Sequence, residues 1–211
     1  MNGLTIVLLL LQLFFFDMQQ TADYPLKLYM VLLGSRGRGR HVEQHDYFFG
    51  IAASLRDLVP QMKAFWPEAG NSLHIDGWRE VTNVDGYSVT VIPKTETLIP
   101  SARKLFFINL GGYQSGKLEE QHDTLLTVQD DRTGAMKAAK RTDFFKTNAI
   151  PAVKGANTHI DEKYGIDVDE IYRIDDLLAP EDKVRYQIRL TPAHSSAADE
   201  IHLGYFQLHK I

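Results

Sequence analysis

Two stretches of the sequence decide the fold: KLYMVLLGSRGRGRHVEQHD, from Lys27 to Asp46, and KLFFINLGGYQSGKLEEQHD, from Lys104 to Asp123. Aligned without a gap, at an offset of 77 residues, they are identical at nine of twenty positions, and the last four identities spell Glu-Gln-His-Asp. A four-letter word alone can recur by chance, but nine ungapped matches in twenty indicate an internal repeat. The sequence therefore predicts two copies of one small folding unit.

The repeat extends beyond the Glu-Gln-His-Asp word. The tripeptide His-Ile-Asp at His74–Asp76 returns at His159–Asp161, now at an offset of 85, and Tyr87 and Tyr172 keep that offset. The change from 77 to 85 predicts an insertion of eight residues in the second copy. Its expected place is the segment 148–157, which contains Pro and Gly.

Each copy has the pattern of a strand, a loop, a second strand and a helix. The first strands, LKLYMVLL and KLFFINL, are apolar on both faces, which is typical of a central strand, and each stops at a glycine, Gly34 or Gly111. The runs YFFGIA and TLLTV follow the tetrapeptide and are short enough for a second strand. A third strand is expected after His-Ile-Asp, through YSVTVI in the first copy, whereas the second copy ends in IYRIDDLL.

A helix is expected between the second and third strands. In the first copy Ser54 or Asp57 is the expected N-cap and Pro67 ends the helix. In the second copy a weaker helix is expected from Thr133 to about Phe145. The residues expected on the inward face are Leu55, Leu58, Val59, Met62 and Trp66 in the first helix and Ala135, Met136 and Ala139 in the second.

The last thirty residues alternate between polar and apolar side chains in KVRYQIRLTP and IHLGYFQLHKI, which predicts a terminal pair of strands. The predicted fold class is α+β, an internally duplicated β-β-α-β unit with pseudo-two-fold symmetry and a C-terminal strand pair. The predicted organisation is a hydrophobic extension or targeting segment (1–23), a first repeat (24–98), a second repeat (101–180) and a strand pair packed on the second repeat (181–211).

Several motifs resemble the family named domain of unknown function 1543, which occurs as one or two copies per chain. They are KLYMVLLG, EQHDYFFGIA, MKAFWP, HIDGWREV with VDGY, and HLGYFQL. The resemblance covers about Leu26 to Ile211 and identifies the chain as similar to a two-copy member. It implies no activity, so no catalytic residue is carried over.

Composition narrows the classes of partner. The chain has 211 residues, of which 44% are hydrophobic and 24% are charged, as in an ordinary globular protein. A net charge of -4 and a pI of about 6.0 argue against nucleic acid as the main partner, because phosphate binding needs a positive field. Cysteine is absent, so disulfides, thiolate metal sites and a cysteine nucleophile are excluded.

The apolar stretch LTIVLLLLQLFFF, Leu4 to Phe16, is too short to span a bilayer, which takes about 20 residues. No stable membrane insertion is therefore expected. Three interpretations are open: an extension upstream of a natural start at Met18, a signal peptide, or a packed terminal segment. The expected localisation is cytoplasmic, with export as the alternative if residues 1–22 are a signal peptide.

Ten polar residues of the repeats form the candidate binding or structural cluster: Glu43, His45, Asp46, His74 and Asp76 in the first copy, and Glu120, His122, Asp123, His159 and Asp161 in the second. In an extended strand residues two apart share a face, so Glu43 and His45 are expected to point one way and Asp46 the other. If the His-Ile-Asp segment lies near the second strand, each copy gathers two imidazoles and two or three carboxylates.

Three interpretations of these clusters are open. Asp, Gln and His can bond backbone groups where a strand leaves a loop, which is a purely structural role. Histidine and carboxylate ligands also suit a divalent metal such as Zn, Mn or Fe, although the spacing matches no established metal signature. A histidine with a carboxylate partner is also suited to acid–base chemistry, for example in a hydrolase.

The loop SRGRGRH contains the only local concentration of positive charge, at Arg36, Arg38 and Arg40. These arginines can hold a phosphate or an acidic ligand, or the loop can be a solvated hairpin. The leading expectation is a duplicated module that binds a small molecule or anion, or a protein partner. The alternatives are a metal-dependent or acid–base enzyme, and a structural role alone.

Overall fold

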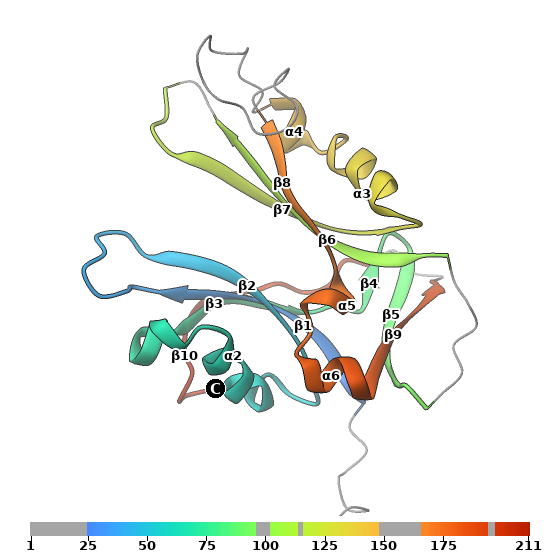
Figure 1. The fold of residues 1–211 in the computed structure, drawn as a ribbon, viewed down its shortest axis with the longest axis horizontal. Helices are drawn as coiled ribbons and strands as arrows, with labels where there is room; N and C mark the ends of the chain where they lie inside the picture. The colour runs from blue at the N-terminus through green and yellow to red at the C-terminus, as the bar shows by residue number, and fades with distance from the viewer. Residues whose placement is uncertain (1–24, 96–101, 114–115, 148–165, 194–196) are drawn as a thin grey trace, which may run out of the picture.

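The computed structural model describes residues 25–95, 102–113, 116–147, 166–193 and 197–211. The expectations for the N-terminal segment, for the insertion and for His159 and Asp161 lie outside these residues. The chain folds as an α+β structure with three antiparallel sheets and a few short helices (Figure 1). The sheets have the strand orders β10-β3-β1-β2, β7-β6-β8 and β4-β5-β9.

The strands are β1 (Lys27–Ser35), β2 (Gln44–Ala52), β3 (His74–Glu80), β4 (Asn83–Val84), β5 (Tyr87–Pro93), β6 (Lys104–Tyr113), β7 (Glu120–Gln129), β8 (Ile166–Arg173), β9 (Tyr186–Pro192) and β10 (His202–Gln207). The helices are α2 (Val59–Phe65), α3 (Arg132–Ala139), α4 (Asp143–Thr147), α5 (Ile174–Leu177) and α6 (Pro180–Arg185), with 3-10 helices η1 (Leu55–Leu58) and η2 (Pro67–Ser72).

The two long hairpins share one register. Gly34 of β1 lies opposite His45 of β2, and Gly111 of β6 lies opposite His122 of β7, so the offset of 77 holds through both strands. The third strands also pair alike, with a register shift at corresponding points of β1 and β6. There, however, His74 lies opposite Gly34, and Asp167 lies opposite Gly111.

The expected offset of 85 is therefore wrong for the third strand of the second half. The position that corresponds to His74 is Asp167, and Tyr172 in β8 does not correspond to Tyr87, which begins β5 in another sheet. The expected strand through YSVTVI is present as β5, but it is not the third strand of the first sheet. His74–Glu80 itself pairs with β1, and the more apolar run after it pairs elsewhere, because hydrophobicity predicts a strand but not its partner.

The two helical segments also differ from expectation in detail. Ser54 precedes η1, and the Asp57 carboxylate accepts hydrogen bonds from the Ser54 amide (3.0 Å) and hydroxyl (2.7 Å), so both expected cap residues take part. The expected helix from Thr133 to Phe145 is two helices. α4 begins after Thr142, whose hydroxyl accepts a hydrogen bond from the Phe145 amide at 3.2 Å.

The expected C-terminal strand pair is not formed. β9 pairs with β5 and β10 pairs with β3, so both strands join elements of the first half instead of each other. Strand β3 has β1 on one side and needs a partner on the other, and β10 satisfies those backbone groups. In this way the end of the described chain is tied to the first half.

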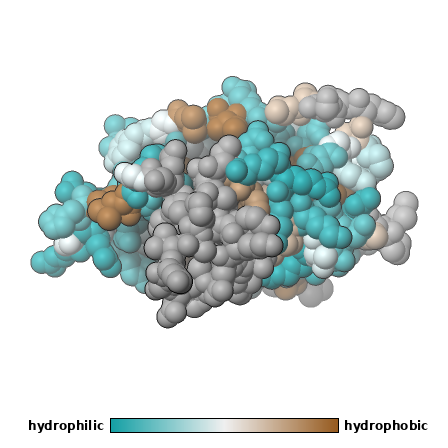
Figure 2. Space-filling view, turned by 90° about the horizontal axis from the view of Figure 1, so that it is seen from above, coloured by the Kyte–Doolittle hydropathy of each residue, from teal (hydrophilic) through white to brown (hydrophobic). Residues whose placement is uncertain are grey.

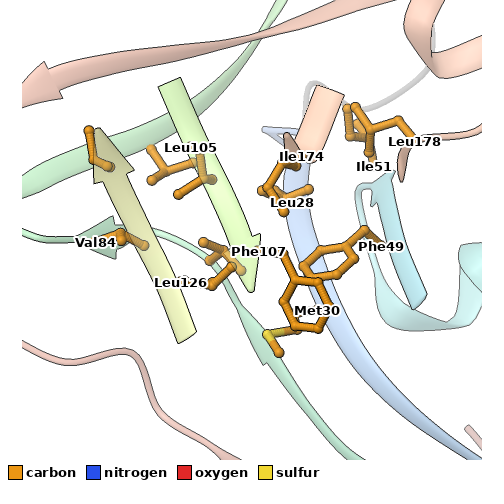
Figure 3. Packing of buried hydrophobic residues seen from close by; sticks show 13 residues of the cluster. Leu28, Met30, Phe49, Ile51, Val84, Leu105, Phe107, Leu126, Ile174 and Leu178 are labelled. Atoms are coloured by element: carbon orange, nitrogen blue, oxygen red, sulfur yellow. The ribbon is translucent and has the colours of Figure 1, made fainter. Parts of the chain in front are cut away.

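A shared core joins the two hairpins face to face (Figure 3). The Phe107 ring lies 5.1 Å from the Phe49 ring and 5.3 Å from the Tyr47 ring. The core positions match at the offset of 77 in four pairs: Leu28 and Leu105, Met30 and Phe107, Phe49 and Leu126, Ile51 and Val128. Both halves thus bury the same face of the same strands.

The outer faces of the hairpins are covered by helices. η1 and α2 pack on the first sheet through Leu58 and Met62, and α3 packs on the second through Ala135 and Ala139 (Figure 1). All four side chains are fully buried. The surface shown in Figure 2 is mostly hydrophilic, with separate apolar patches. Within the described ranges no helix is long and apolar enough to cross a membrane.

Candidate functional site

The first-half cluster lies beyond the shared core, toward the β1–β2 loop. Alternation along the chain places Glu43 and His45 on the same face as Tyr47, Phe49 and Ile51, and these last three belong to or pack against the shared core. His45 and Asp76 meet across the sheet, with 3.1 Å between Nε2 and Oδ2. The expected convergence of the tetrapeptide and the His-Ile-Asp segment is therefore present in the first half.

His74 is the buried member of the cluster. Its side chain is 4% exposed, against 24% for Asp76, 41% for Glu43 and 45% for His45. Its Nδ1 lies 2.8 Å from the Ser72 carbonyl oxygen, and because a carbonyl only accepts hydrogen bonds, Nδ1 carries the proton. The backbone contact thus fixes the tautomer of His74 and leaves Nε2 for the cluster.

The Ser72 carbonyl is itself held in place by hydrogen bonds of its own residue. The Ser72 hydroxyl donates to the Ala69 carbonyl at 2.7 Å and lies 2.7 Å from the hydroxyl of Ser35, which is buried in β1. The 3-10 turn that ends η2 is therefore tied to the central strand. His74 is anchored by a rigid part of the fold and not by a loop.

The other ring nitrogen of His74 is close to two carboxylates but not satisfied by them. Nε2 lies 3.0 Å from Glu43 Oε1 and 3.2 Å from Asp76 Oδ1. Neither contact has the direction of a hydrogen bond, and both Nε2 and Asp76 Oδ2 are buried atoms without a hydrogen-bond partner. Buried polar atoms in this condition are rare and point to a missing proton, ion or ligand.

Gly34 makes room for this cluster. A Cβ at that position would lie 2.2 Å from Asp76 Oδ2 and 2.6 Å from His74 Nε2, far inside van der Waals contact. The histidine and aspartate side chains lie directly over the glycine, which β1 places opposite His45 and His74. In the first half, packing therefore explains why glycine stands at this repeated position.

A hollow opens beside the cluster, with a volume of about 460 Å³. We call it the His74 hollow, and its lining residues are Arg36, His41, Glu43, Ser72, His74 and Tyr205. The Tyr205 ring lies 4.3 Å from the His74 ring at an interplanar angle of 38°. All three loop arginines are exposed, and of the three Arg36 alone lines this hollow.

Asp46 lies apart from the other candidate residues of the first half. It lies on the opposite face of β2, and its carboxylate accepts a hydrogen bond from the Tyr47 amide at 2.7 Å. Asp123 makes the same local bond with the Thr124 amide at 2.9 Å. For these two residues the structural interpretation of the repeat fits in both halves.

The second half lacks a histidine at the position of His74. His122 Nε2 lies 3.6 Å from Glu120 Oε2, and the residue opposite Gly111 is Asp167. His159 and Asp161 lie outside the described residues. The two clusters, expected to be alike, differ in the residue that is most buried in the first half.

A larger hollow of about 800 Å³ lies away from this chemistry, around Thr82, Asp199 and His202. The Asp199 carboxylate in this hollow already has hydrogen-bond partners. It accepts hydrogen bonds from the Thr82 amide at 3.1 Å and from the Thr82 hydroxyl at 2.5 Å. We therefore place the candidate site in the smaller hollow, where buried polar atoms are unsatisfied.

Three lining residues of the His74 hollow were not predicted from the sequence: His41, Ser72 and Tyr205. His41 stands within the arginine-rich loop, and its position was readable as part of SRGRGRH. Ser72 acts through its backbone carbonyl, for which no sequence signal exists. Tyr205 reaches the hollow only because β10 pairs with β3, a partner choice that alternation does not determine.

Known proteins resemble this chain in part. A family model described as Domain of Unknown Function (DUF1543) matches residues 40–91, and one copy of the domain is detected. No curated protein matches the chain. A crystal structure of the protein Il1583 from Idiomarina loihiensis is similar at 20% identity and a TM-score of 0.59, covering 87% of this chain and 97% of that one. At this identity the likeness concerns the fold alone.

Proposed function

We propose that this chain is a duplicated α+β module that binds a small anionic molecule in the His74 hollow. The common register of the two hairpins and the four matched core pairs support descent of both halves from one ancestor. The second half is then a diverged copy, which agrees with the loss of the histidine opposite Gly111. The net charge of -4 supports a small molecule over nucleic acid as the partner.

The observation that carries the proposal is the placement of Arg36 at a hollow of small-molecule size. Arginine binds carboxylate and phosphate groups through two parallel hydrogen bonds, and His41 adds a second basic side chain beside it. Glu43 on the same wall repels a plain anion and favours a ligand that also carries a hydrogen-bond donor. The Tyr205 ring offers an apolar surface to the rest of the ligand.

The test uses inorganic phosphate and acetate as probes on the full chain freed of metal, followed by chemical-shift titration. Phosphate is expected to perturb residues around the His74 hollow. Arg36→Ala should weaken binding about tenfold or more, because a hydrogen bond to a charged group contributes roughly 1.5–3 kcal/mol. Arg38→Ala, an exposed arginine of the same loop outside the hollow, is the matched control and should leave binding unchanged. Equal effects of the two substitutions would reject the site.

Acid–base catalysis is the second candidate function. It is favoured by one observation, the contact of 3.1 Å between the half-exposed His45 and the Asp76 carboxylate. A carboxylate close to a solvent-accessible imidazole is suited to proton transfer. Turnover of p-nitrophenyl ester or phosphate substrates that is abolished by His45→Gln, and kept by His122→Gln, would favour this function over binding alone.

A further inference from the structure

The buried, unsatisfied ring nitrogen of His74 faces two carboxylate oxygens, and we propose that this place binds one divalent transition-metal ion. His74, Glu43 and Asp76 are the ligands, and His45 is within reach as a fourth through its contact with Asp76. The site shares a wall with the His74 hollow but does not depend on the proposed anion binding.

The protonation of His74 is the first step. With the proton on Nδ1, directed at the Ser72 carbonyl, Nε2 presents a lone pair. Two carboxylate oxygens lie 3.0 and 3.2 Å from Nε2, so three acceptor atoms lie close together without a hydrogen bond between them. A positive charge between them removes the repulsion. Metal-binding histidines commonly donate their other N–H to a backbone carbonyl, as His74 does.

The distances are those of neighbouring ligands on one ion. Two ligand atoms that are each about 2.1 Å from a metal lie about 3.0 Å apart around an octahedral ion and about 3.4 Å apart around a tetrahedral one. The three contacts within the cluster measure 3.0, 3.1 and 3.2 Å. Because neither oxygen next to His74 Nε2 has the direction of a hydrogen bond, this nitrogen remains available to an ion.

Binding requires some adjustment of side chains. As placed, no three His, Asp or Glu side chains of the described ranges converge on one point at metal–ligand distances. The fixed component is His74, which is held by Ser72 and covered by the Tyr205 ring. Glu43 and His45 are 41% and 45% exposed, and such side chains change rotamer at little cost, so they can close on an ion held by His74.

The donor set selects the class of ion. One or two imidazoles with two carboxylates suit Zn²⁺, Mn²⁺ or Fe²⁺, whereas ions that prefer sulfur ligands are disfavoured in a chain without cysteine. At the register position of His74 the second half has Asp167, so no imidazole stands opposite Gly111. One transition-metal ion per chain is therefore expected, despite the repeat.

The experiment measures Zn²⁺ binding to the full chain after chelator treatment, by calorimetry and by elemental analysis after desalting. About one ion per chain is expected, together with a rise in melting temperature as free Zn²⁺ increases. His74→Gln should abolish binding. His122→Gln, the substitution at the matched position of His45 in the second half, should leave the stoichiometry and the affinity unchanged.

Absence of binding at millimolar Zn²⁺, binding that survives His74→Gln, or loss of binding in His122→Gln would each overturn the proposal. If His74→Gln does not fold, Glu43→Gln on the exposed wall replaces it, and its affinity should fall by at least about tenfold. Phosphate binding is measured on the metal-free chain with Arg36→Ala. A chain that binds Zn²⁺ and no phosphate therefore keeps this site and loses the anion proposal, and the reverse result does the opposite.

Discussion

Gly34 shows how one residue without a side chain determines the local arrangement. In Gly34→Ala the new methyl group would overlap Asp76 and His74, which are held by packing and by the Ser72 carbonyl. Overpacking of this kind typically costs about 1–3 kcal/mol in the free energy of unfolding.

Gly37→Ala is the matched control, because its Cβ would make ordinary contacts at 3.5 and 3.7 Å. Denaturant unfolding should show the loss for Gly34→Ala and a change within about 0.5 kcal/mol for Gly37→Ala. Equal effects would mean that the cluster moves aside without cost.

Tyr29 is buried in β1, and burial together with the nearby Glu80 carboxylate raises its pKa from 10.0 to about 12. Because the folded-state pKa lies above the unfolded one, this group stabilises the fold fully below about pH 10. The contribution is lost as pH rises through about 12. Absorbance titration of tyrosinate should show one late-titrating group, and Tyr29→Phe should remove both that group and its share of alkaline unfolding.

Asp182 of α6 is 4% exposed, and burial raises the pKa of its carboxyl against opposing hydrogen bonds from Gln61 and the Ile51 backbone. The folded state therefore binds this proton more tightly than the unfolded state. Stability from this group is complete in acid, below the unfolded pKa, and declines as pH rises through the folded pKa.

Asp182→Asn keeps an acceptor and adds a donor where Asp182 Oδ2 and Gln61 Oε1 lack partners. The variant should be more stable than the parent at neutral pH, with a flatter dependence of stability on pH between acid and neutral conditions. Urea unfolding at several pH values measures this. A variant that is destabilised at every pH would show that the charged carboxylate is structurally required.

At the scale of elements, the two covering helices bury different amounts of side chain at matched positions. Leu58 and Met62 of the first half correspond to Ala135 and Ala139 of the second at the offset of 77, and all four are 0% exposed. Met62→Ala should cost about 2–5 kcal/mol because it leaves a cavity. Met136→Ala, at a half-buried position of α3, should cost clearly less, and chemical denaturation compares the two.

The sequence predicts elements well where periodicity determines them, and partners poorly where it does not. The ungapped alignment predicted matching strands in the two halves, and both hairpins have one register, because a slip of one residue would turn every core side chain outward. β9 and β10 were recognised as strands from alternation, but their pairing with β5 and β3 depends on which edges the rest of the fold leaves open. The break between α3 and α4 had a readable signal in the capping residue Thr142.

The candidate site was likewise predictable only in part. Glu43, His45, His74 and Asp76 were predictable, since residues two apart share a face of a strand and the two strands flank β1. Asp46 lies apart from these residues because the same rule places it on the other face of β2. The His-Ile-Asp match of the second half misled the alignment, because three letters carry too little information to fix a register across an insertion.

For the whole molecule, we expect the shared core to make the two halves unfold as one cooperative unit. Phe107 of β6 packs against Phe49 and Tyr47 of β2, so Phe107→Ala should cost about 3–5 kcal/mol and destabilise both hairpins together. Calorimetry should show a single transition for parent and variant, and a fragment of residues 25–95 should not fold alone. Two separate transitions would mean that each half has a sufficient core of its own.

The pairing of β10 with β3 also means that the first sheet can be completed only late in synthesis. Strand β3 emerges from the ribosome early, yet its outer neighbour is translated only after the chain between Glu80 and His202 has been made. Tyr205, which covers His74, travels with that late strand. In a nascent or prematurely terminated polypeptide, His74 therefore lacks its cover and the outer edge of β3 lacks its partner strand. The His74 hollow is complete only in a molecule synthesised through β10.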